Sequence, residues 1–142
     1  MDAWVLQDGE TVGDVMSAEF VEASRAQAAQ RPDHTVPIAA GHWSTALMRD
    51  GTPAQLSASI RRLVPCPVGW FEDPLVLLRF ADLHIPANYI FLRQDLAAPR
   101  ELFETMAASL GGPRIVECEG SRQAMITRPE AVAEAVLIGA KD

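Results

Sequence analysis

The chain has 142 residues, of which 49% are hydrophobic and 22% charged, so it is long enough to form one globular domain with a core. Its formal net charge of −7 argues against nucleic acid or an anionic membrane as a main partner, because both select basic surfaces. The first residues do not resemble a secretory signal, and no apolar stretch approaches the roughly 20 residues that span a bilayer.

Cysteine and histidine are scarce and show no metal-ligand spacing. Cys66 and Cys118 lie far apart in the sequence, which is typical of two reduced thiols in a cytoplasmic protein. Cys118 falls inside an expected strand, which favours burial. The histidines are His34, His42 and His84, and no pair of them has metal spacing. We therefore predict neither a metal site nor a cofactor.

The first half of the chain predicts one strand and two helices. Residues 3–6 form a short apolar run that leads into a turn and is typical of a strand. Ser17 caps a helix that is expected to reach about residue 30. Residues 31–45 hold two prolines and a glycine and predict an irregular connection. Thr52-Pro53 is a strong helix start, with a capping residue followed by proline.

The second half predicts an alternation of strands and helices. Residues 88–92 and 114–118 are apolar, β-rich runs, and residues 99–110 between them form a helix that stops at Gly111-Gly112. A last helix begins at Pro129, and three of its apolar side chains are expected on one side: Val132, Val136 and Leu137. This order predicts right-handed parallel crossovers with helices flanking a sheet.

Two segments of this second half resemble the part of α/β-hydrolases that carries the acid and the histidine of the catalytic triad. They are Ile-Pro-Ala-Asn-Tyr-Ile-Phe-Leu-Arg-Gln-Asp, which ends at Asp95, and Arg-Ile-Val-Glu-Cys-Glu-Gly-Ser-Arg-Gln-Ala-Met, which contains Arg122. Asp95 stands at the acid position and Arg122 at the histidine position. Arginine stays protonated at neutral pH, so it cannot act as the general base of a Ser-His-Asp triad.

The resemblance extends to the N-terminal residues. Residues 2–12 resemble the strand that follows the nucleophile helix in esterase-like and hydroxynitrile-lyase-like members, and residues 13–80 resemble their cap. The resemblance implies one α/β domain over residues 1–142: a cap-like segment (13–80) and a hydrolase-like part (1–12 and 81–142). The implied fold is a truncated, α/β-hydrolase-like one with a small parallel three-stranded sheet flanked by helices.

The first half of that fold, with the nucleophile elbow Gly-x-Ser-x-Gly, has no counterpart in the sequence. The nearest stretch is Gly-His-Trp-Ser-Thr at 41–45, which has tryptophan at the serine position and lacks the second glycine. A hydrolase part of this kind would leave the first strand unpaired along one edge, and such edges pair with other chains. We expect a homodimer through this N-terminal edge strand. A partner polypeptide, or a monomer whose cap helices cover the edge, are the alternatives.

The candidate site lies at the carboxyl ends of the last two strands, where open α/β sheets place their ligands. There Arg122 would hold a carboxylate, phenolate or enolate, and Asp95 would orient it or accept a proton. His42 is a candidate acid or base in the cap-like segment. Four residues are candidate contacts to a small organic molecule: Trp43, Trp70, Phe71 and Ser121. For each of these side chains the alternative is an ordinary ion pair, hydrogen bond or core contact.

Three functions are compatible with this pattern. The first is a small-molecule-binding, non-hydrolytic protein that catalyses a cyclase, lyase or isomerase type of step in specialised metabolism by non-covalent acid-base chemistry. The second is a catalytically inactive accessory protein that pairs with another enzyme. The third is half of a split hydrolase, which Arg122 disfavours. The sequence does not decide whether the protein is an enzyme, because a fold does not fix an activity.

Overall fold

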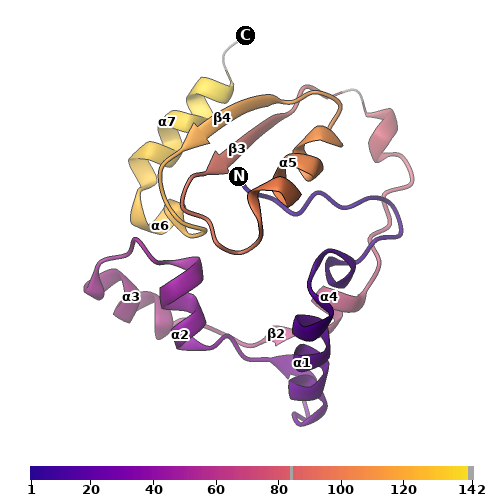
Figure 1. Ribbon diagram of the computed structural model, residues 1–142, viewed down its shortest axis with the longest axis vertical. Coiled ribbons are helices and arrows are strands. Elements are labelled where there is room, and N and C mark those ends of the chain that lie inside the picture. The colour runs from indigo at the N-terminus through magenta and orange to yellow at the C-terminus, as the bar shows by residue number, and fades with distance from the viewer. Residues whose placement is uncertain (84, 141–142) are drawn as a thin grey trace. The chain divides into compact units, whose positions relative to one another are not determined.

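The computed structural model describes residues 1–83 and 85–140. Its elements, in chain order, are η1 (Val12–Val15), α1 (Ala18–Ala29), β1 (Thr35–Val36), α2 (Ala40–His42), η2 (Trp43–Leu47), α3 (Pro53–Ile60), β2 (Cys66–Pro67), α4 (Gly69–Glu72), η3 (Phe80–Asp82), β3 (Asn88–Leu92), α5 (Arg100–Ala108), β4 (Arg114–Cys118), α6 (Ala124–Thr127) and α7 (Pro129–Gly139). Here η1 and η3 are 3-10 turns, and η2 is a π-helical turn that continues α2. Figure 1 shows the chain coloured along its length.

The chain forms two compact units. Unit 1 consists of residues 1–5, 39–62 and 85–142, and unit 2 consists of residues 6–38 and 63–84. Residues 39–62 of the cap-like segment therefore group with the sheet-forming part. The proposed division of the chain into a cap-like segment and a hydrolase-like part stays a prediction.

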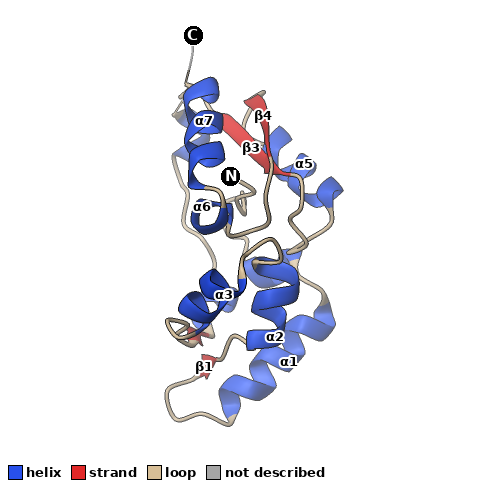
Figure 2. Cartoon of the chain, turned by 90° about the vertical axis from the view of Figure 1, so that its left-hand side faces the viewer, coloured by secondary structure: helices blue, strands red, loops and turns tan. Residues whose placement is uncertain are grey.

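The core of unit 1 is the parallel pair β3–β4, in register from Asn88 opposite Arg114 to Leu92 opposite Cys118. Alternate side chains of these strands face opposite sides. One side packs against α6 and α7 through a buried cluster: Ile90, Leu92, Val116, Cys118, Ala124 and Ala135. Figures 1 and 2 show α5 on the other side of the pair from α7. The expected α/β class, with a small parallel sheet flanked by helices, is confirmed.

Local signals account for the helices of unit 1. The Thr52 hydroxyl accepts from the Gln55 N–H while the Gln55 side chain accepts from the Thr52 N–H, and this capping box starts α3 as predicted. Pro129 stands at the first position of α7. After α5, Gly111 has a φ of +76°, a left-handed conformation that suits glycine at a helix end.

The strand predicted at residues 3–6 is wrong, because no strand is present in that part of the chain. The segment runs beside β3 but makes few ladder contacts. Asp2, the residue before this segment, donates its backbone N–H to the carbonyl of Ile90. The next N–H on that edge, of Leu92, is taken by the side chain of Asp2, whose φ of +32° turns the chain. The described sheet therefore has two parallel strands where three were expected.

The apolar side of α7 differs in part from the prediction. Ala135 and Gly139 are its buried residues, and Val132 packs beside the core cluster. Val136 and Leu137, which were expected on the same side as Val132, are exposed. Small residues therefore make the close contact of α7 with the sheet, and the larger ones lie at the surface.

Unit 2 is built around α1 and the short antiparallel pair β1–β2. The Ser17 hydroxyl accepts from the Phe20 N–H and starts α1, as the sequence predicted. Phe71 of α4 is buried and contacts the rings of Phe20 and Trp70 edge-on, with ring centroids 5.6 and 4.9 Å away. Figure 2 shows that unit 2 is mainly helix and loop, apart from its two short strands.

Candidate functional site

The loops that follow β3 and β4 lie side by side at the carboxyl ends of these strands. The N–H of Arg93 donates to the Cys118 carbonyl, and the N–H of Gln94 donates to the Gly120 carbonyl. Gly120 has a φ of +131°, and a Cβ there would lie 2.7 Å from the Cβ of Ala124. The turn before Arg122 therefore requires glycine, and it directs Arg122 toward the loop that carries Asp95.

Asp95 and Arg122 form an ion pair in a largely buried setting. Nη1 of Arg122 lies 3.0 Å from Oδ2 of Asp95, and the exposed fractions of the two side chains are 18% and 2%. Oδ1 of Asp95 accepts from the Ala97 N–H at 2.8 Å. The guanidinium carbon lies 5.1 Å from the ring centre of Trp4 and 5.4 Å from that of Phe103. Aromatic faces at this distance stabilise a cation.

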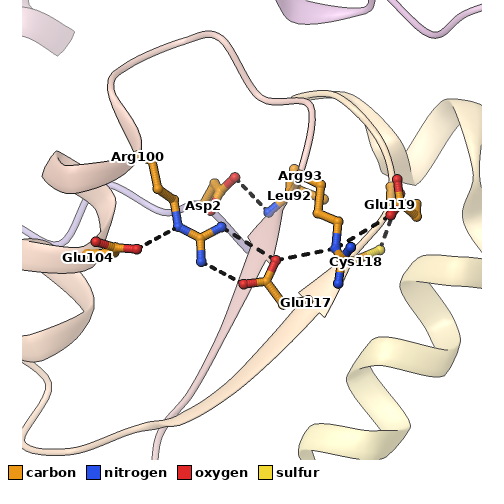
Figure 3. A network of polar contacts seen from close by, with 8 residues as sticks. All are labelled: Asp2, Leu92, Arg93, Arg100, Glu104, Glu117, Cys118 and Glu119. Atoms are coloured by element: carbon orange, nitrogen blue, oxygen red, sulfur yellow. Dashed lines mark hydrogen bonds and ion pairs between the residues drawn. The ribbon is translucent and has the colours of Figure 1, made fainter.

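Asp2 is a third charged residue of this cluster, and no sequence pattern predicts it. Its carbonyl accepts from Nη1 of Arg122 at 2.7 Å, so one nitrogen of Arg122 serves both Asp2 and Asp95. Oδ2 of Asp2 accepts from the Leu92 N–H at 2.9 Å, a contact that Figure 3 shows. The residue is 2% exposed, and its Oδ1 has no hydrogen-bond partner among the described residues.

The environment of Asp2 favours its protonated form. Burial raises its pKa, the bond from the Leu92 N–H lowers it, and the neighbouring Asp95 raises it again, with a net value of about 6. The pKa of Tyr89 is also raised, first by burial and then by the charge of Asp2. The Tyr89 hydroxyl donates to the Ala3 carbonyl at 2.9 Å, so Tyr89 holds the N-terminal segment as a neutral phenol.

Ser121, a candidate ligand contact, is fully buried in a second polar cluster. Its hydroxyl donates to the Asp50 carboxylate, and Asp50 also accepts from Thr127 and Arg128, each at 3.0 Å. Burial alone would raise the pKa of Asp50, but these three hydrogen bonds outweigh burial and leave the pKa below its usual value. Ser121 therefore ties the β4 loop to Leu47, at the end of η2, and to Asp50, and its contact with a ligand stays a prediction.

A network of exposed charges lies along β4 on the side of α5 (Figure 3). Arg100 of α5 binds Glu117 at 2.6 Å and Glu104 at 3.0 Å, and its guanidinium carbon lies 3.7 Å from the ring centre of Phe91. Arg93 pairs with Glu117 and with Glu119. Each of the two arginines is paired with two glutamates, so neither is an unpaired cation for a ligand.

His42 and Trp43 lie in unit 1, on α2 and η2. The side chain of His42 is exposed, whereas Trp43 is buried and its indole N–H donates to Ser59 at 2.9 Å. The neighbouring Ser44 donates to the carbonyls of Ala40 and Gly41 within one helical segment. This segment is no strand-turn-helix elbow, which agrees with the absence of a nucleophile motif. Trp43 fills the core.

Two of the remaining candidates and one histidine belong to unit 2. Trp70 and Phe71 belong to unit 2, where they contact each other. His34 is in unit 2 with a φ of +48°, and His84 lies outside the described residues. Both cysteines are free, and Cys118 is buried as expected. No group of three or more His, Cys, Asp or Glu side chains in the described part of the chain could hold a metal ion.

Asp2 and Asp50, the two buried carboxylates that organise the loops around Arg122, are not marked by any motif in the sequence. Asp2 lay next to an expected strand, and Asp50 lay in a stretch that we assigned to the cap. A motif search gives no signal for either. The feature of the sequence that could have pointed to Asp2 is its place: it is a short acidic residue directly before an apolar run.

No family model and no curated protein matches the chain. Among solved structures, it resembles an extracellular α/β-hydrolase from a Paenibacillus species with a TM-score of 0.88 and 25% identity. The match covers 99% of this chain and 60% of that one, so the chain spans about 60% of the length of this relative. That enzyme is described as sharing structural and functional homology with tobacco salicylic acid binding protein 2.

Two structures of polyneuridine aldehyde esterase are also similar. One has a TM-score of 0.61, with 17% identity over 72% of this chain and 42% of that one, and a mutant of the same enzyme has a TM-score of 0.62. Within the described residues, no helix is long and apolar enough to cross a membrane. The chain therefore has an α/β-hydrolase-like fold, over the part of that fold which it spans.

Proposed function

We propose that this chain is a non-hydrolytic, small-molecule-binding α/β-hydrolase-like protein that holds an organic anion at Arg122. The observation that carries the proposal is the hydrogen-bonding pattern of this side chain. Within the described part of the chain, its hydrogen bonds come from Nη1 alone, and the side chain keeps an exposed fraction of 18%. Nε and Nη2 are the nitrogens that remain for a carboxylate, phenolate or enolate.

The surroundings of Arg122 favour an aromatic anion. The half-buried Trp4 lies against the guanidinium and provides apolar contact area beside the charge, while the buried Phe103 packs against Trp4 with ring centres 5.5 Å apart. Salicylate is a rational first probe, because the Paenibacillus relative is described as homologous to a salicylic acid binding protein. If Arg122 also stabilises an anionic intermediate such as an enolate, the same site would support a cyclase, lyase or isomerase step. Asp95 would then be the group that orients Arg122.

Calorimetric titration of the purified chain with salicylate and with benzyl alcohol tests the proposal. We expect salicylate to bind and the uncharged aromatic to bind at least about tenfold more weakly, since the charged hydrogen bond contributes 1.5–3 kcal/mol in typical cases. Arg122→Gln should abolish the difference. Arg93→Gln is the matched control, because Arg93 lies on the same rim but is exposed and paired with two glutamates. Equal affinity of the two probes would contradict the proposal.

Ester hydrolysis separates this proposal from a hydrolase. Arg122 holds its proton, and the serine nearest to a nucleophile motif, Ser44, donates within its own helical segment. We expect no release of nitrophenol from nitrophenyl acetate above the rate of a heat-treated sample. Hydrolysis that survives purification and disappears in Arg122→Gln would overturn the non-hydrolytic assignment.

A catalytically inactive accessory role is the second candidate, and exposed apolar side chains favour it. Ile115 of β4 and three consecutive residues of α7, Val136, Leu137 and Ile138, are exposed, with Leu137 at 66%. Exposed apolar groups of this size are typical of surfaces that bind another chain. Binding of salicylate without turnover of any substrate, together with stable association to a second protein, would support this role over catalysis.

The homodimer stays a prediction, but the surface through which we propose that two copies pair changes. The N-terminal segment is not a strand, and the side chain of Asp2 occupies the N–H of Leu92 on that edge of β3. Pairing of two copies would instead use the exposed residues of α7. Light scattering that gives twice the chain mass, lost in Leu137→Glu, is the expected result. The cytoplasmic location also stays a prediction.

A further inference from the structure

We infer that unit 2 binds an organic amine in a cavity lined by η1, α1 and α4, with Asp14 and Glu22 as the carboxylates that face its ammonium group. The cavity has a volume of about 400 Å³, which is within the range of small-molecule pockets in proteins. All the residues that line it belong to unit 2. The inference therefore goes beyond the anion site proposed at Arg122 and does not depend on it.

One face of α1 and the buried ring of α4 form the cavity wall. Four residues of α1 line it: Ala18, Val21, Glu22 and Arg25. They follow the i, i+3, i+4, i+7 spacing that places side chains on one side of a helix. Phe71 of α4 also lines the cavity and is buried, and Val21 is half-buried. The inner part of the cavity is therefore apolar.

The charged side chains of the cavity leave it with a negative charge. Three carboxylates and one guanidinium line it, which gives a net charge of −2 at neutral pH. Nε of Arg25 pairs with Oε1 of Glu72, so these two charges compensate each other. The two carboxylates that remain are those of Asp14 and Glu22, and both residues are exposed. The uncompensated negative charge therefore lies at the rim of the cavity.

The capping box of η1 fixes Asp14 in position. Oδ2 of Asp14 accepts from the N–H and from the hydroxyl of Thr11, each at 2.8 Å. These hydrogen bonds lower the pKa of Asp14, so its carboxylate is ionised at neutral pH. Among the described residues, neither Oδ1 of Asp14 nor the Glu22 carboxylate has a hydrogen bond or an ion pair. Both are left to accept from an ammonium group on a ligand.

This arrangement favours an organic amine over a metal ion. A metal ion needs several oxygen ligands around one point, and no group of three or more His, Cys, Asp or Glu side chains in the described ranges could hold one. An ammonium group needs only one or two carboxylates. A ligand whose ammonium group meets the rim can place its carbon atoms against Val21 and Phe71. Charge and apolar surface are then matched together.

Calorimetric titration of the full chain with phenethylamine and with 2-phenylethanol tests the inference. The two probes share a ring and a two-carbon spacer, and at neutral pH the amine carries a positive charge that the alcohol lacks. At physiological ionic strength we expect the amine to bind about fivefold more tightly, the factor that an ion pair at an exposed rim gives. Equal affinity of the two probes would overturn the inference.

A matched pair of variants on α1 separates the cavity from the overall negative charge of the chain. Glu22→Gln should lower the affinity for phenethylamine about threefold and leave that for 2-phenylethanol unchanged. Glu19→Gln removes the same charge from an exposed residue of α1 that does not line the cavity, and should bind as the parent does. Equal losses in the two variants would mean that the amine follows net charge and has no site in the cavity.

Methyl NMR of the full chain locates the bound amine. We expect phenethylamine to shift the methyl resonances of Val21 and Met16, which line the cavity. Arg122→Gln, which removes the cation of the proposed anion site, should bind the amine as the parent does. Shifts confined to residues of unit 1, or loss of amine binding in Arg122→Gln, would place the amine outside this cavity and reject the inference. Neither result would bear on salicylate binding at Arg122.

Discussion

Asp95 and Arg122, 27 positions apart in the sequence, meet at 3.0 Å where the loops after β3 and β4 lie together. In the resemblance that the sequence suggested, these are the positions of a catalytic acid and its histidine. Here the acid faces a permanent cation. The pair keeps the contact between the two loops, but Arg122 cannot take up a proton from a nucleophile as the histidine of a triad does.

The first prediction concerns the stability that this pair confers. Arg122→Gln leaves the Asp95 carboxylate, with 2% of its side chain exposed, facing a neutral partner. Removal of one partner from a buried ion pair costs about 3–5 kcal/mol, and glutamine recovers part of this through a hydrogen bond. We expect the free energy of unfolding in urea to fall by about 2 kcal/mol.

Arg93→Gln is again the matched control, since Arg93 lies 57% exposed at the same rim. Exposed ion pairs contribute about 0–1 kcal/mol, so this variant should unfold close to the parent. The double variant Asp95→Asn with Arg122→Gln should be more stable than Arg122→Gln alone, because the buried charge of Asp95 is removed together with its partner. Equal losses for the two arginine variants would argue that the Asp95–Arg122 pair contributes no more than a surface contact.

The second prediction concerns Asp50, which accepts hydrogen bonds from Ser121, Thr127 and Arg128. Its pKa is lowered in the folded chain, so its contribution to stability is present above its ordinary pKa and is lost as pH falls through the lowered value. Acid unfolding should therefore become steep below about pH 4. Asp50→Asn should lower the unfolding free energy at pH 7 by about 2 kcal/mol and flatten this acid limb.

Urea midpoints measured between pH 2.5 and pH 7 check the behaviour of Asp50. Asp33→Asn provides the comparison, because Asp33 also has a lowered pKa, through the Thr35 hydroxyl, but lies exposed in unit 2. A steep acid limb that survives in Asp50→Asn would assign the acid sensitivity to other carboxylates.

Local signals predicted the helices and strands that they specify, and long-range contacts set the rest. The capping residues at Ser17 and Thr52 and the apolar run at 88–92 act over a few neighbouring positions, and each produced the expected element. The contact of Asp2 with Arg122 spans 120 positions, and that of Asp50 with Ser121 spans 71. Such pairings depend on the finished fold, so neither buried carboxylate was identified in advance.

The same distinction explains the predicted strand that does not form. Residues 3–6 have strand-like composition, but the side chain of Asp2 takes the N–H that a third strand would have used. Trp43 and Ser121, which residue type suggested as ligand contacts, are buried and hydrogen-bonded within unit 1, and their contact with a ligand stays a prediction. Residue type alone does not distinguish a pocket wall from a core residue.

The third prediction concerns Gly120, the turn residue before Ser121 and Arg122. A Cβ there would meet the Cβ of Ala124 at 2.7 Å, and the φ of +131° is one that L-residues rarely adopt. Gly120→Ala must therefore shift the loop or α6, and we expect a loss of about 3 kcal/mol in unfolding free energy. Because the loop carries Arg122, salicylate binding should fall with it.

Two glycines separate backbone conformation from crowding at position 120. Gly111→Ala has a positive φ but open space around the added methyl, and should cost about 1 kcal/mol. Gly41→Ala has open space at a helical φ and should be neutral or slightly stabilising. A Gly120→Ala loss no greater than that of Gly111→Ala would show that the loop relaxes freely.

The fourth prediction concerns the exposed charge network on β4. Glu117 accepts from Arg100, and this hydrogen bond, against the opposing effect of burial, holds its pKa below the ordinary value. Its side chain is 36% exposed, so solvent screens the pair and Glu117→Gln should cost less than about 1 kcal/mol.

Thermal unfolding at low and high salt checks this: added salt should reduce the difference between Glu117→Gln and the parent. The Asp95–Arg122 pair, being largely buried, should respond less, so the loss in Arg122→Gln should persist at high salt. A salt response of equal size for both variants would mean that the Arg122 cluster is as open to solvent as the network on β4.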